Sequence, residues 1–490
     1  MKTLFTVLIL FTTFNFGISQ IQIGDDLTGI LADDDFGYSV SISDDGQRVA
    51  IGAPGNIIGQ EAVYVQIFQK SGTDWVQLGN TITGKLPINN AGGRLALSGD
   101  GNRLILGAIY NNNGTMSGSV LVYQYNGSDW AQMGSPLGTV DELTSVGRAV
   151  AISGNGNVIA FTTTMVTSIS EITGRVDVFE WQGSGWQKRG NTFLPTETFD
   201  LYGYALDLSD NGSRIAIGAS NGIAPATGQS SGFAQIFQFQ NGNWLQVGSN
   251  IYGKYSLSSF GKDVSLSGNG NRIIVSGPGS VNGLILTGAV RAFDFNGNDW
   301  QMVGDELIGT ENFDRFGEGI KVSKDGNYFV YGSTRDGDGT GCAALYKLVG
   351  NSWEMHQNKV CGDFDRDDFG FSVDVSNNGA SIVTGARVND EDGVKNGYAR
   401  VWNYEMTSSN LNPEERTLKV FPNPASDRIS LQTNSEETTF LSVYNMNQQL
   451  VLQQVVKPKE EIDIEFLSSG MYILLIQTGD QNFYSKLIKN

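Results

Sequence analysis

A motif that recurs every 53 to 58 residues restricts the fold of this chain more than any other feature of its sequence. In its first copy the motif reads Phe-Gly-Tyr-Ser-Val-Ser-Ile-Ser, from Phe36 to Ser43. Self-similarity at a fixed period is the sequence signature of repeat architectures. The period therefore predicts seven structural repeats. Their motif glycines are Gly37, Gly92, Gly147, Gly203, Gly261, Gly317 and Gly370.

Each copy of the motif predicts four short strands. Apolar residues alternate with serines from Ser39 to Ile42, which is the two-residue period of a strand with two different faces. An Asp-Gly or Asn-Gly turn leads to an apolar second strand, Arg48–Ala53 in the first copy, and then to a third, Val63–Gln69. The fourth strand begins with tryptophan in six copies, and we expect these rings to fill wedge-shaped gaps between repeats rather than to bind a ligand. They are Trp75, Trp130, Trp186, Trp244, Trp300 and Trp353.

The seventh copy lacks a fourth strand, because the chain leaves the repeat pattern after Tyr404. The missing piece is at the other end, where Ile21–Gly29 matches the fourth-strand region Val76–Gly84 of the first copy. A strand from the N-terminus can therefore complete the last repeat and leave no open edge. The sequence predicts an all-β fold in which residues 20–404 form a seven-bladed β-propeller closed by an N-terminal strand.

The repeats resemble a known family. The Phe-Gly pair, the alternating strand and the continuation Ile51-Gly52-Ala53-Pro54 are similar to the FG-GAP repeats of integrin α-chain propellers and their bacterial relatives. The resemblance covers Ile21 to Tyr404. In the second and third copies Ala91 and Val146 replace the phenylalanine.

The resemblance implies calcium sites, because integrin-type propellers hold Ca²⁺ in Asp-rich loops after the Gly-Ala-Pro strand. A hard cation of this kind takes several oxygen ligands from carboxylates, amides and backbone. The matching residues are Asp336 and Asp338 in the sixth copy, and Asp390, Asp392 and Asn396 in the seventh. The alternative is that these residues only shape turns.

Residues 405–417 are polar and read as a linker, and residues 418–490 predict a second, smaller domain. Its short alternating runs, such as Phe440–Tyr444, predict a small β-sandwich. Its motifs resemble the type A C-terminal sorting domain of the type IX (Por) secretion system, which implies that residues 418–490 engage that machinery. The motifs are Val420–Pro424, Val443–Gln448, Leu467–Tyr472 and Lys486–Lys489.

Residues 1–19 predict a secretory signal peptide, with Lys2 before an apolar run and small residues before the expected cleavage point. A transmembrane anchor is the alternative, but the run from Leu4 to Phe16 is shorter than the ~20 residues that span a bilayer. We expect no membrane span. The expected location is extracellular or at the outer-membrane surface, after Sec export and type IX secretion.

Charge and residue usage exclude several functions. The net charge of −19 argues against nucleic acid as a partner. The chain has a single histidine, His356, no phosphate-binding loop and no Cys/His metal motif. Acidic clusters precede the Phe-Gly step at Asp33–Asp35, Asp314 and Asp363–Asp368, and we interpret them as solvated loop charge or help in binding a cation rather than as a glycosidase pair. We therefore expect no catalytic residues and no enzyme activity.

The two cysteines, Cys342 and Cys361, lie on consecutive predicted strands, and the sequence leaves open whether they form a disulfide or stay as thiols.

The leading functional hypothesis is a non-catalytic binding and adhesion propeller at the cell surface, which recognises protein or glycan through its blade loops. A structural surface component without a specific ligand is one alternative. A polysaccharide-acting hydrolase, or a lectin-like module that serves one, is another. A deep acidic pocket at the centre of the ring would favour the hydrolase, whereas exposed Tyr and Trp on one loop face would favour the binding propeller.

Overall fold

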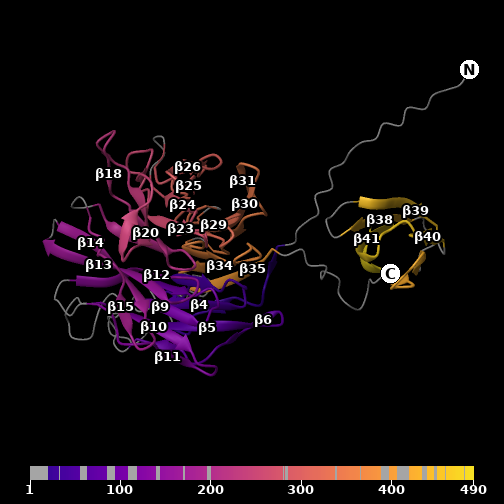
Figure 1. Ribbon diagram of the computed structural model, residues 1–490, viewed down its shortest axis with the longest axis horizontal. Helices are drawn as coiled ribbons and strands as arrows, with labels where there is room; N and C mark the ends of the chain where they lie inside the picture. The colour runs from indigo at the N-terminus through magenta and orange to yellow at the C-terminus, as the bar shows by residue number, and fades with distance from the viewer. Residues whose placement is uncertain are drawn as a thin grey trace, which may run out of the picture. The chain divides into compact units, whose positions relative to one another are not determined.

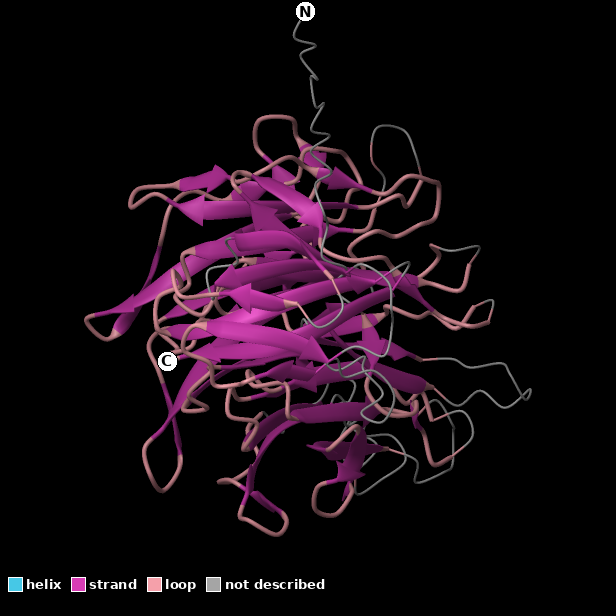
Figure 2. Ribbon diagram, turned by 90° about the vertical axis from the view of Figure 1, so that its right-hand side faces the viewer, coloured by secondary structure: helices cyan, strands magenta, loops and turns pink. Residues whose placement is uncertain are grey.

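The computed structural model describes residues 20–490 apart from 32–33, 56–62, 85–93, 109–117, 139–143, 169–170, 196–199, 280, 282–284, 337–338, 365, 388–396, 405–418, 433–438, 446–449, 458–459 and 479–480. The expected signal peptide and linker lie outside the described residues. Within them every regular element is a strand, which confirms the all-β prediction (Figure 2). The chain divides into two compact units, Met1–Glu405 and Met406–Asn490 (Figure 1). No helix long and apolar enough to cross a membrane occurs in the described part of the chain.

The described residues of the first unit form seven antiparallel sheets of four or five strands, and a short separate hairpin of β18 (Ile223–Ala224) and β19 (Gln229–Ser230). The first four sheets, each given in chain order, are β3 (Ser39–Ile42), β4 (Arg48–Ala53), β5 (Tyr64–Ser71), β6 (Asp74–Gln77) and β7 (Ile82–Thr83); β8 (Arg94–Leu97), β9 (Arg103–Ala108), β10 (Ser119–Tyr125) and β11 (Trp130–Gln132); β12 (Thr144–Ile152), β13 (Val158–Ser168), β14 (Glu171–Trp181) and β15 (Trp186–Lys188); and β16 (Tyr202–Leu208), β17 (Arg214–Ala219), β20 (Phe233–Gln240), β21 (Asn243–Gln246) and β22 (Ile251–Tyr252).

The remaining three sheets follow the same order. They are β23 (Asp263–Leu266), β24 (Arg272–Gly277), β25 (Ala289–Phe295), β26 (Trp300–Met302) and β27 (Leu307–Ile308); β28 (Ile320–Val322), β29 (Tyr328–Ser333), β30 (Cys342–Val349), β31 (Ser352–Met355) and β32 (Val360–Cys361); and β33 (Ser372–Val375), β34 (Ser381–Ala386) and β35 (Tyr398–Asn403) with β1 (Ile21–Gln22) and β2 (Leu27–Thr28). Four consecutive strands per repeat, side by side in one sheet, are the blade of a β-propeller.

The turn between the first two strands of a blade explains the repeated Ser-x-Asp/Asn-Gly sequence. In the first blade the Ser43 hydroxyl accepts the Arg48 N–H at 2.9 Å and donates to the Asp45 carboxylate at 2.6 Å. Gly46 follows with φ of 69°, a left-handed conformation that costs glycine little. Serine, acid or amide, and glycine each have one task in this turn, so the sequence is repeated in every copy.

The first strands of the seven described sheets lie next to one another. Strand β3 lies against β8, β8 against β12, and the series continues through β16, β23, β28 and β33 back to β3. A belt of backbone hydrogen bonds runs through the turns that end these strands and returns to its starting residue. Its bonds are Asp44 N to Gly99 O, Gly99 N to Gly154 O, Asn155 N to Asp210 O, Asp210 N to Gly268 O, Gly268 N to Lys324 O, Asp325 N to Asn377 O, and Asn377 N to Asp44 O.

The N-terminal segment provides the outer strand of the last blade. Strand β1 pairs with β35 so that Ile21 lies opposite Asn403, and β2 pairs with the same strand further along. The Ile23 N–H donates to Val401 O at 2.8 Å. In the first blade β6 and β7 pair with β5 in the same way, as the match of Ile21–Gly29 to Val76–Gly84 predicts.

The fourth-strand tryptophans join each blade to the one before it. Each indole N–H donates to a backbone carbonyl of the preceding blade, and Trp75 donates to Ile23 O of the N-terminal segment at 3.1 Å. The rings are buried, so each one adds a large apolar contact and satisfies its polar N–H. The other bonds are Trp130 to Leu78 O, Trp186 to Met133 O, Trp244 to Arg189 O, Trp300 to Val247 O and Trp353 to Val303 O, at 2.7 to 3.0 Å.

The second unit has two antiparallel sheets that share one core. Leu441, Val443 and Leu474 from one sheet pack with Ile429 and Ile462 from the other. The strands of the two sheets are β36 (Lys419–Phe421), β37 (Arg428–Gln432) and β40 (Glu461–Asp463), and β38 (Thr439–Asn445), β39 (Leu450–Val456), β41 (Gly470–Thr478) and β42 (Gln481–Lys489).

Candidate functional site

The side chains that line the inside of the ring differ from copy to copy, although the motif around them repeats. Counted from the motif glycine, the third and fifth following residues are apolar in all seven copies, and the sixth is always serine. The second following residue varies among basic, acidic, hydroxyl and small types. The repeated pattern does not require one residue type at the second position, so the side chains there can be suited to a ligand. The seven second-position residues are Ser39, Arg94, Ala149, Ala205, Asp263, Gly319 and Ser372.

All seven of these residues line one cavity, with a volume of about 400 Å³. The walls come from the innermost strands and from the residues just before them. Further lining residues include Tyr38, Tyr204, Phe371, Lys262, Arg315, Glu318 and Arg387. We call this cavity the axial pocket, and its volume lies in the ~300–1,000 Å³ range of small-molecule sites.

A network of buried polar groups lies deeper on the axis, at the fourth position after the motif glycine. The Asp207 carboxylate accepts bonds from Lys321 Nζ at 3.1 Å, the Ser265 hydroxyl at 3.0 Å and the Leu266 N–H at 2.8 Å. Burial opposes ionisation of Asp207, but Lys321 and Lys324 hold the pKa of its carboxyl below the usual value. Burial alone would lower the pKa of Lys321, yet Asp207 and Asp374 raise it.

Two further carboxylates bridge neighbouring blades, Asp374 at the same fourth position and Asp263 at the second position, on the wall of the axial pocket. Asp374 accepts bonds from the Ser41 hydroxyl and the Ile42 N–H, at 2.8 and 2.9 Å, and Asp263 accepts the Ile320 N–H at 2.9 Å. These backbone donors lie on the inner edge of a sheet, where no further strand can pair with them. Burial raises the pKa of Asp263 to about 6, although its two backbone hydrogen bonds favour the ionised form. The network fixes the spacing of the innermost strands.

The axis is filled at the end where the backbone belt lies. A side chain at Gly99 would place its Cβ 2.2 Å from an oxygen of Asp44, and one at Gly268 would meet Asp210 at 2.2 Å. The two carboxylates therefore occupy the space that the belt glycines leave, and Lys324 forms an ion pair with Asp210 at 3.1 Å. A ligand of the axial pocket must enter from the opposite end, where the Phe-Gly steps lie.

The wall near that end carries two neighbouring aromatic rings, each contacted by a guanidinium group. Arg94 lies over the ring of Tyr38 at 5.5 Å, the ring of Tyr38 lies 4.9 Å from that of Phe371, and Arg387 lies over Phe371 at 4.4 Å. Asp368 holds Arg387 through two bonds of 2.8 Å. Stacking uses the faces of a guanidinium and leaves its N–H edges for hydrogen bonds.

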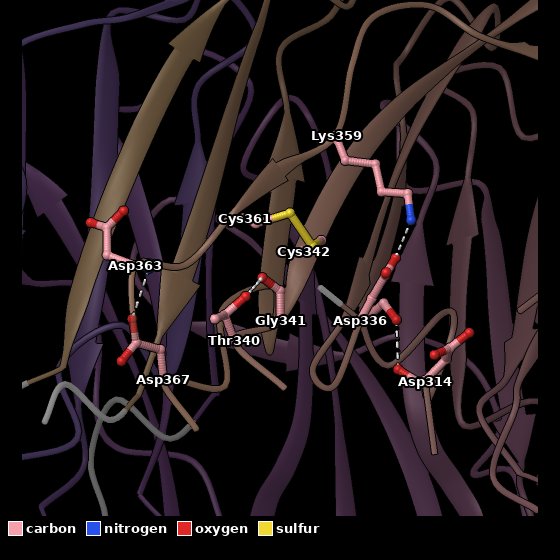
Figure 3. Close-up of a disulfide and its surroundings, with 10 residues drawn as sticks. Asp314, Asp336, Thr340, Gly341, Cys342, Lys359, Cys361, Asp363 and Asp367 are labelled. Carbon is pink, nitrogen blue, oxygen red and sulfur yellow. Dashed lines mark hydrogen bonds and ion pairs between the residues drawn. A yellow bond between two sulfur atoms is a disulfide. The ribbon is translucent and has the colours of Figure 1, made fainter. Parts of the chain in front are cut away.

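The loops proposed to bind calcium are described only in part. The Asp336 carboxylate accepts a bond from Lys359 Nζ at 2.6 Å, on one side of the Cys342–Cys361 disulfide in Figure 3. The other four residues of the prediction lie outside the described residues; they are Asp338, Asp390, Asp392 and Asn396. No group of three or more His, Cys, Asp or Glu side chains arranged for a metal ion occurs among the residues that the structure describes.

The acidic residues before the Phe-Gly step are not solvated loop charges, and this part of the sequence interpretation is wrong for Asp34, Asp314 and Asp367. Asp34 is fully buried and accepts bonds from the Phe36 N–H at 3.0 Å and from the Tyr64 hydroxyl. Asp314 and Asp367 likewise accept backbone N–H groups of their own loops. Such carboxylates satisfy buried donors, which alternating hydrophobicity does not reveal.

His356, the single histidine of the sequence, takes no part in the axial pocket. It follows the outer strand β31, with its ring 5.3 Å from that of Tyr328 and 6.5 Å from that of Tyr404. Burial lowers the pKa of His356, and Lys347 lowers it further. Its role in this position is packing.

The two cysteines form a disulfide, which closes the question that the sequence left open. Cys342 on β30 lies opposite Cys361 on the edge strand β32, 19 residues later (Figure 3). The bridge ties a short edge strand to the sheet.

Replacing both cysteines by serine is expected to lower the free energy of unfolding by about 3 kcal/mol, because a loop of this length then regains its freedom in the unfolded chain. The measurement is chemical denaturation of the oxidised wild type and the Cys342→Ser/Cys361→Ser variant, with the reduced wild type as control. Equal stability of all three would contradict the assignment.

The fold and the pocket define a β-propeller with an axial cavity, followed by a separate β-sheet unit. Residues 419–490 match the family model of the secretion system C-terminal sorting domain, which confirms the predicted sorting domain. This domain supports secretion through the type IX system to the cell surface or the extracellular space.

Several solved structures are similar to this chain. A putative 6-phosphogluconolactonase from Bacteroides uniformis has 14% identity, with 67% of this chain and 86% of that chain covered and a TM-score of 0.45. The periplasmic gluconolactonase of Pseudomonas aeruginosa has 12% identity, 82% and 94% coverage and a TM-score of 0.43. The β-propeller domain of the Trilobed protease from Pyrococcus furiosus has 12% identity, 73% and 91% coverage and a TM-score of 0.43. Similarity at this level says nothing about chemistry. No curated protein matches the chain.

Proposed function

We propose that this protein is a secreted, non-catalytic binding propeller that recognises an extracellular protein or glycan and serves adhesion at the cell surface. In this proposal the seven sheets are the blades of one closed ring, built from FG-GAP-like repeats as in integrin α-chains, and the type IX machinery delivers it. The observation that carries the proposal is the axial pocket, to which every one of the seven repeats contributes a side chain.

The construction of the pocket supports binding. The carboxylates of Asp207, Asp263 and Asp374 accept hydrogen bonds from neighbouring blades, and these bonds hold the wall in place. A site whose walls are already fixed loses little conformational freedom when a ligand enters, so more of the contact energy remains as affinity. This favours recognition over a purely structural surface role.

The arrangement of acids favours binding over hydrolysis. Only two carboxylate residues, Asp263 and Glu318, are among the residues lining the described pocket. Both carboxylate oxygens of Asp263 accept backbone N–H groups, at 2.9 Å from Val264 and Ile320, and Glu318 forms an ion pair with Lys262. A glycosidase needs one acid to donate a proton to the leaving group and a second carboxylate beside the sugar. Here both groups are engaged in holding the wall.

An array of extracellular glycans and surface proteins tests this proposal, with the chain from Gln20 to Asn490 as the probe. We expect binding to a restricted set of ligands, without turnover of any of them. A folded protein that binds nothing on the array would favour the structural role, and product release from a bound polysaccharide would favour the hydrolase.

Calcium is a second element of the proposal, and the loop of the seventh copy with Asp390, Asp392 and Asn396 is its best candidate. Asp336 in the sixth copy supports it less, because its carboxylate is engaged by Lys359. Carboxylate and amide oxygens are suitable ligands for Ca²⁺.

Calcium is expected to raise the melting temperature of the chain, since an ion that binds only the native state stabilises it by about 3 kcal/mol when present at ~100 times its Kd. Thermal unfolding in millimolar calcium and then in chelator measures the effect. The rise should disappear in Asp390→Ala/Asp392→Ala and persist in Asp336→Ala. A melting temperature that does not respond to calcium would leave these loops as turns.

A further inference from the structure

We propose that the axial pocket binds the carboxylate of an acidic saccharide unit, such as a hexuronic acid residue of an extracellular polysaccharide. The inference rests on the proposed binding function and names the ligand class. Its basis is the juxtaposition of basic side chains, neighbouring aromatic rings and hydroxyl groups on the wall of one cavity.

The charge of the residues that line the pocket favours an anionic ligand. Four basic residues line the pocket, against the two acids Asp263 and Glu318, in a chain whose net charge is −19. The basic residues are Arg94, Lys262, Arg315 and Arg387. A cavity with low-dielectric walls focuses the field of such a cluster, so it attracts anions against the overall negative charge of the protein.

Two of the four basic residues already form ion pairs. Lys262 forms an ion pair with Glu318, and Arg387 pairs with Asp368. Among the described residues, no carboxylate lies within ion-pair distance of Arg315. Its guanidinium, on the mouth side of the pocket, is therefore available for a bidentate bond to a carboxylate, which is the strong form of such contacts.

Aromatic rings on the wall of the pocket contact guanidinium groups by their faces. Arg94 and Arg387 lie over Tyr38 and Phe371, whose rings lie next to one another. Arg148, which lines a neighbouring pocket, lies over the ring of Tyr204 at 4.6 Å, and Tyr204 lines the axial pocket. Rings that contact guanidinium groups by their faces limit the rotation of these groups, so their orientation is fixed before a ligand arrives.

The size of the pocket and the mixture of polar groups on its wall fit a sugar acid better than a small anion. A cavity of about 400 Å³ is far larger than an inorganic anion requires. Ser39 and Ser372 line the wall, and the Ser372 hydroxyl, which donates to Gly37 O at 2.8 Å, can still accept a hydrogen bond from a ligand. Donors and acceptors around one carboxylate-binding group match a sugar acid, whose ring carries hydroxyls next to its carboxylate. A peptide C-terminus shares the carboxylate but not the hydroxyls.

Calorimetric titration of the chain from Gln20 to Asn490 tests the inference, with digalacturonate as the probe. Neutral digalactose, inorganic phosphate and an acetylated tripeptide with a free C-terminus are the comparison ligands. We expect digalacturonate to bind at least about 10-fold more tightly than any of these, with affinity falling as salt rises.

The variant Arg94→Gln/Arg315→Gln removes two positive charges from the pocket and is expected to weaken digalacturonate binding at least about 10-fold. Lys70→Gln/Lys188→Gln is the matched control, because it removes two positive charges from β5 and β15, away from the pocket, and should bind as the wild type does. Arg315→Gln alone provides a second test if the double variant unfolds.

Each outcome of the titration supports or contradicts the proposal. Preference for the neutral sugar, for phosphate or for the tripeptide would overturn the inference, as would equal loss of binding in the control. If the array detects ligands that do not require an acid, the proposed binding function stands and this inference fails. If the array detects nothing and digalacturonate does not bind, both fail.

Discussion

Deleting residues 20–29 is expected to lower the melting temperature of the first unit by more than about 10 °C. The deletion removes the bonds of Ile23 to Val401, of Gly29 to Gly397, of Trp75 to Ile23 and the paired bonds of Arg400 to Asp26. Five hydrogen bonds at ~1 kcal/mol each approach the whole stability of a domain, which is ~5–15 kcal/mol. Differential scanning calorimetry measures the effect.

The control for this deletion moves the segment instead of removing it. In the control, residues 20–29 are placed after Tyr404 and joined to it by a copy of the turn Asn296–Asp299. The moved segment can then form the same outer strand, and the melting temperature should return to near that of the wild type. An unchanged melting temperature in the simple deletion would refute ring closure by the N-terminal strand.

Deleting residues 418–490 is expected to abolish delivery to the cell surface or the medium and to leave the protein in the periplasm. The expected effect is large, because the matched sorting domain is the part of the chain that directs passage through the outer membrane in this type of secretion. Cell fractionation and immunoblotting in a host with type IX machinery measure it.

A smaller change provides the control for this experiment. Removing Lys486–Lys489 cuts into the end of β42 and the motif it carries, and should also block delivery. Substitution of exposed Lys457 by Gln, elsewhere in the same unit, should leave delivery unchanged. Surface delivery of the chain without residues 418–490 would contradict the sorting role.

Much of the fold could be predicted because the same sequence pattern occurs in seven copies, so a weak signal in one copy is supported by the others. One copy of Ser39–Ile42 followed by Asp-Gly is a weak hairpin signal, but seven copies make the sheets and their turns predictable. The match of Ile21–Gly29 to Val76–Gly84 also predicted the partner of β1, since strands with the same sequence take the same place in a sheet. The tryptophans at the start of the fourth strands lie between blades, as expected.

The structural carboxylates could not be predicted from the pattern. Asp34 and Asp367 are short polar residues next to Phe-Gly, and sequence alone does not distinguish a carboxylate that caps buried donors from one in water. The distinction depends on tertiary contacts, such as the hydroxyl of Tyr398 that reaches Asp367 from a later strand at 2.9 Å. The disulfide was undetermined for the same reason, because it requires the register of β30 against β32.

The sequence prediction placed recognition in the blade loops and considered a pocket at the centre of the ring only as a sign of a hydrolase. The signal was present, since the position of Arg94 and Asp263 varies while the third, fifth and sixth positions after the motif glycine keep their residue type. What the sequence could not show is that residues so far apart in the chain surround one cavity, with Arg315 and Arg387 at its wall. Only ring formation brings them together.

The central claim is that recognition takes place in the axial pocket, and filling the pocket tests it most directly. Gly319 lines the cavity, and a Cβ there would lie 3.2 Å from Phe371 O, so Gly319→Phe places a ring on the axis with a small local shift. We predict that this variant keeps a melting temperature within a few degrees of the wild type, while its binding on the glycan and protein array falls at least about 10-fold. Equal binding by both proteins would contradict the account and return recognition to the blade loops.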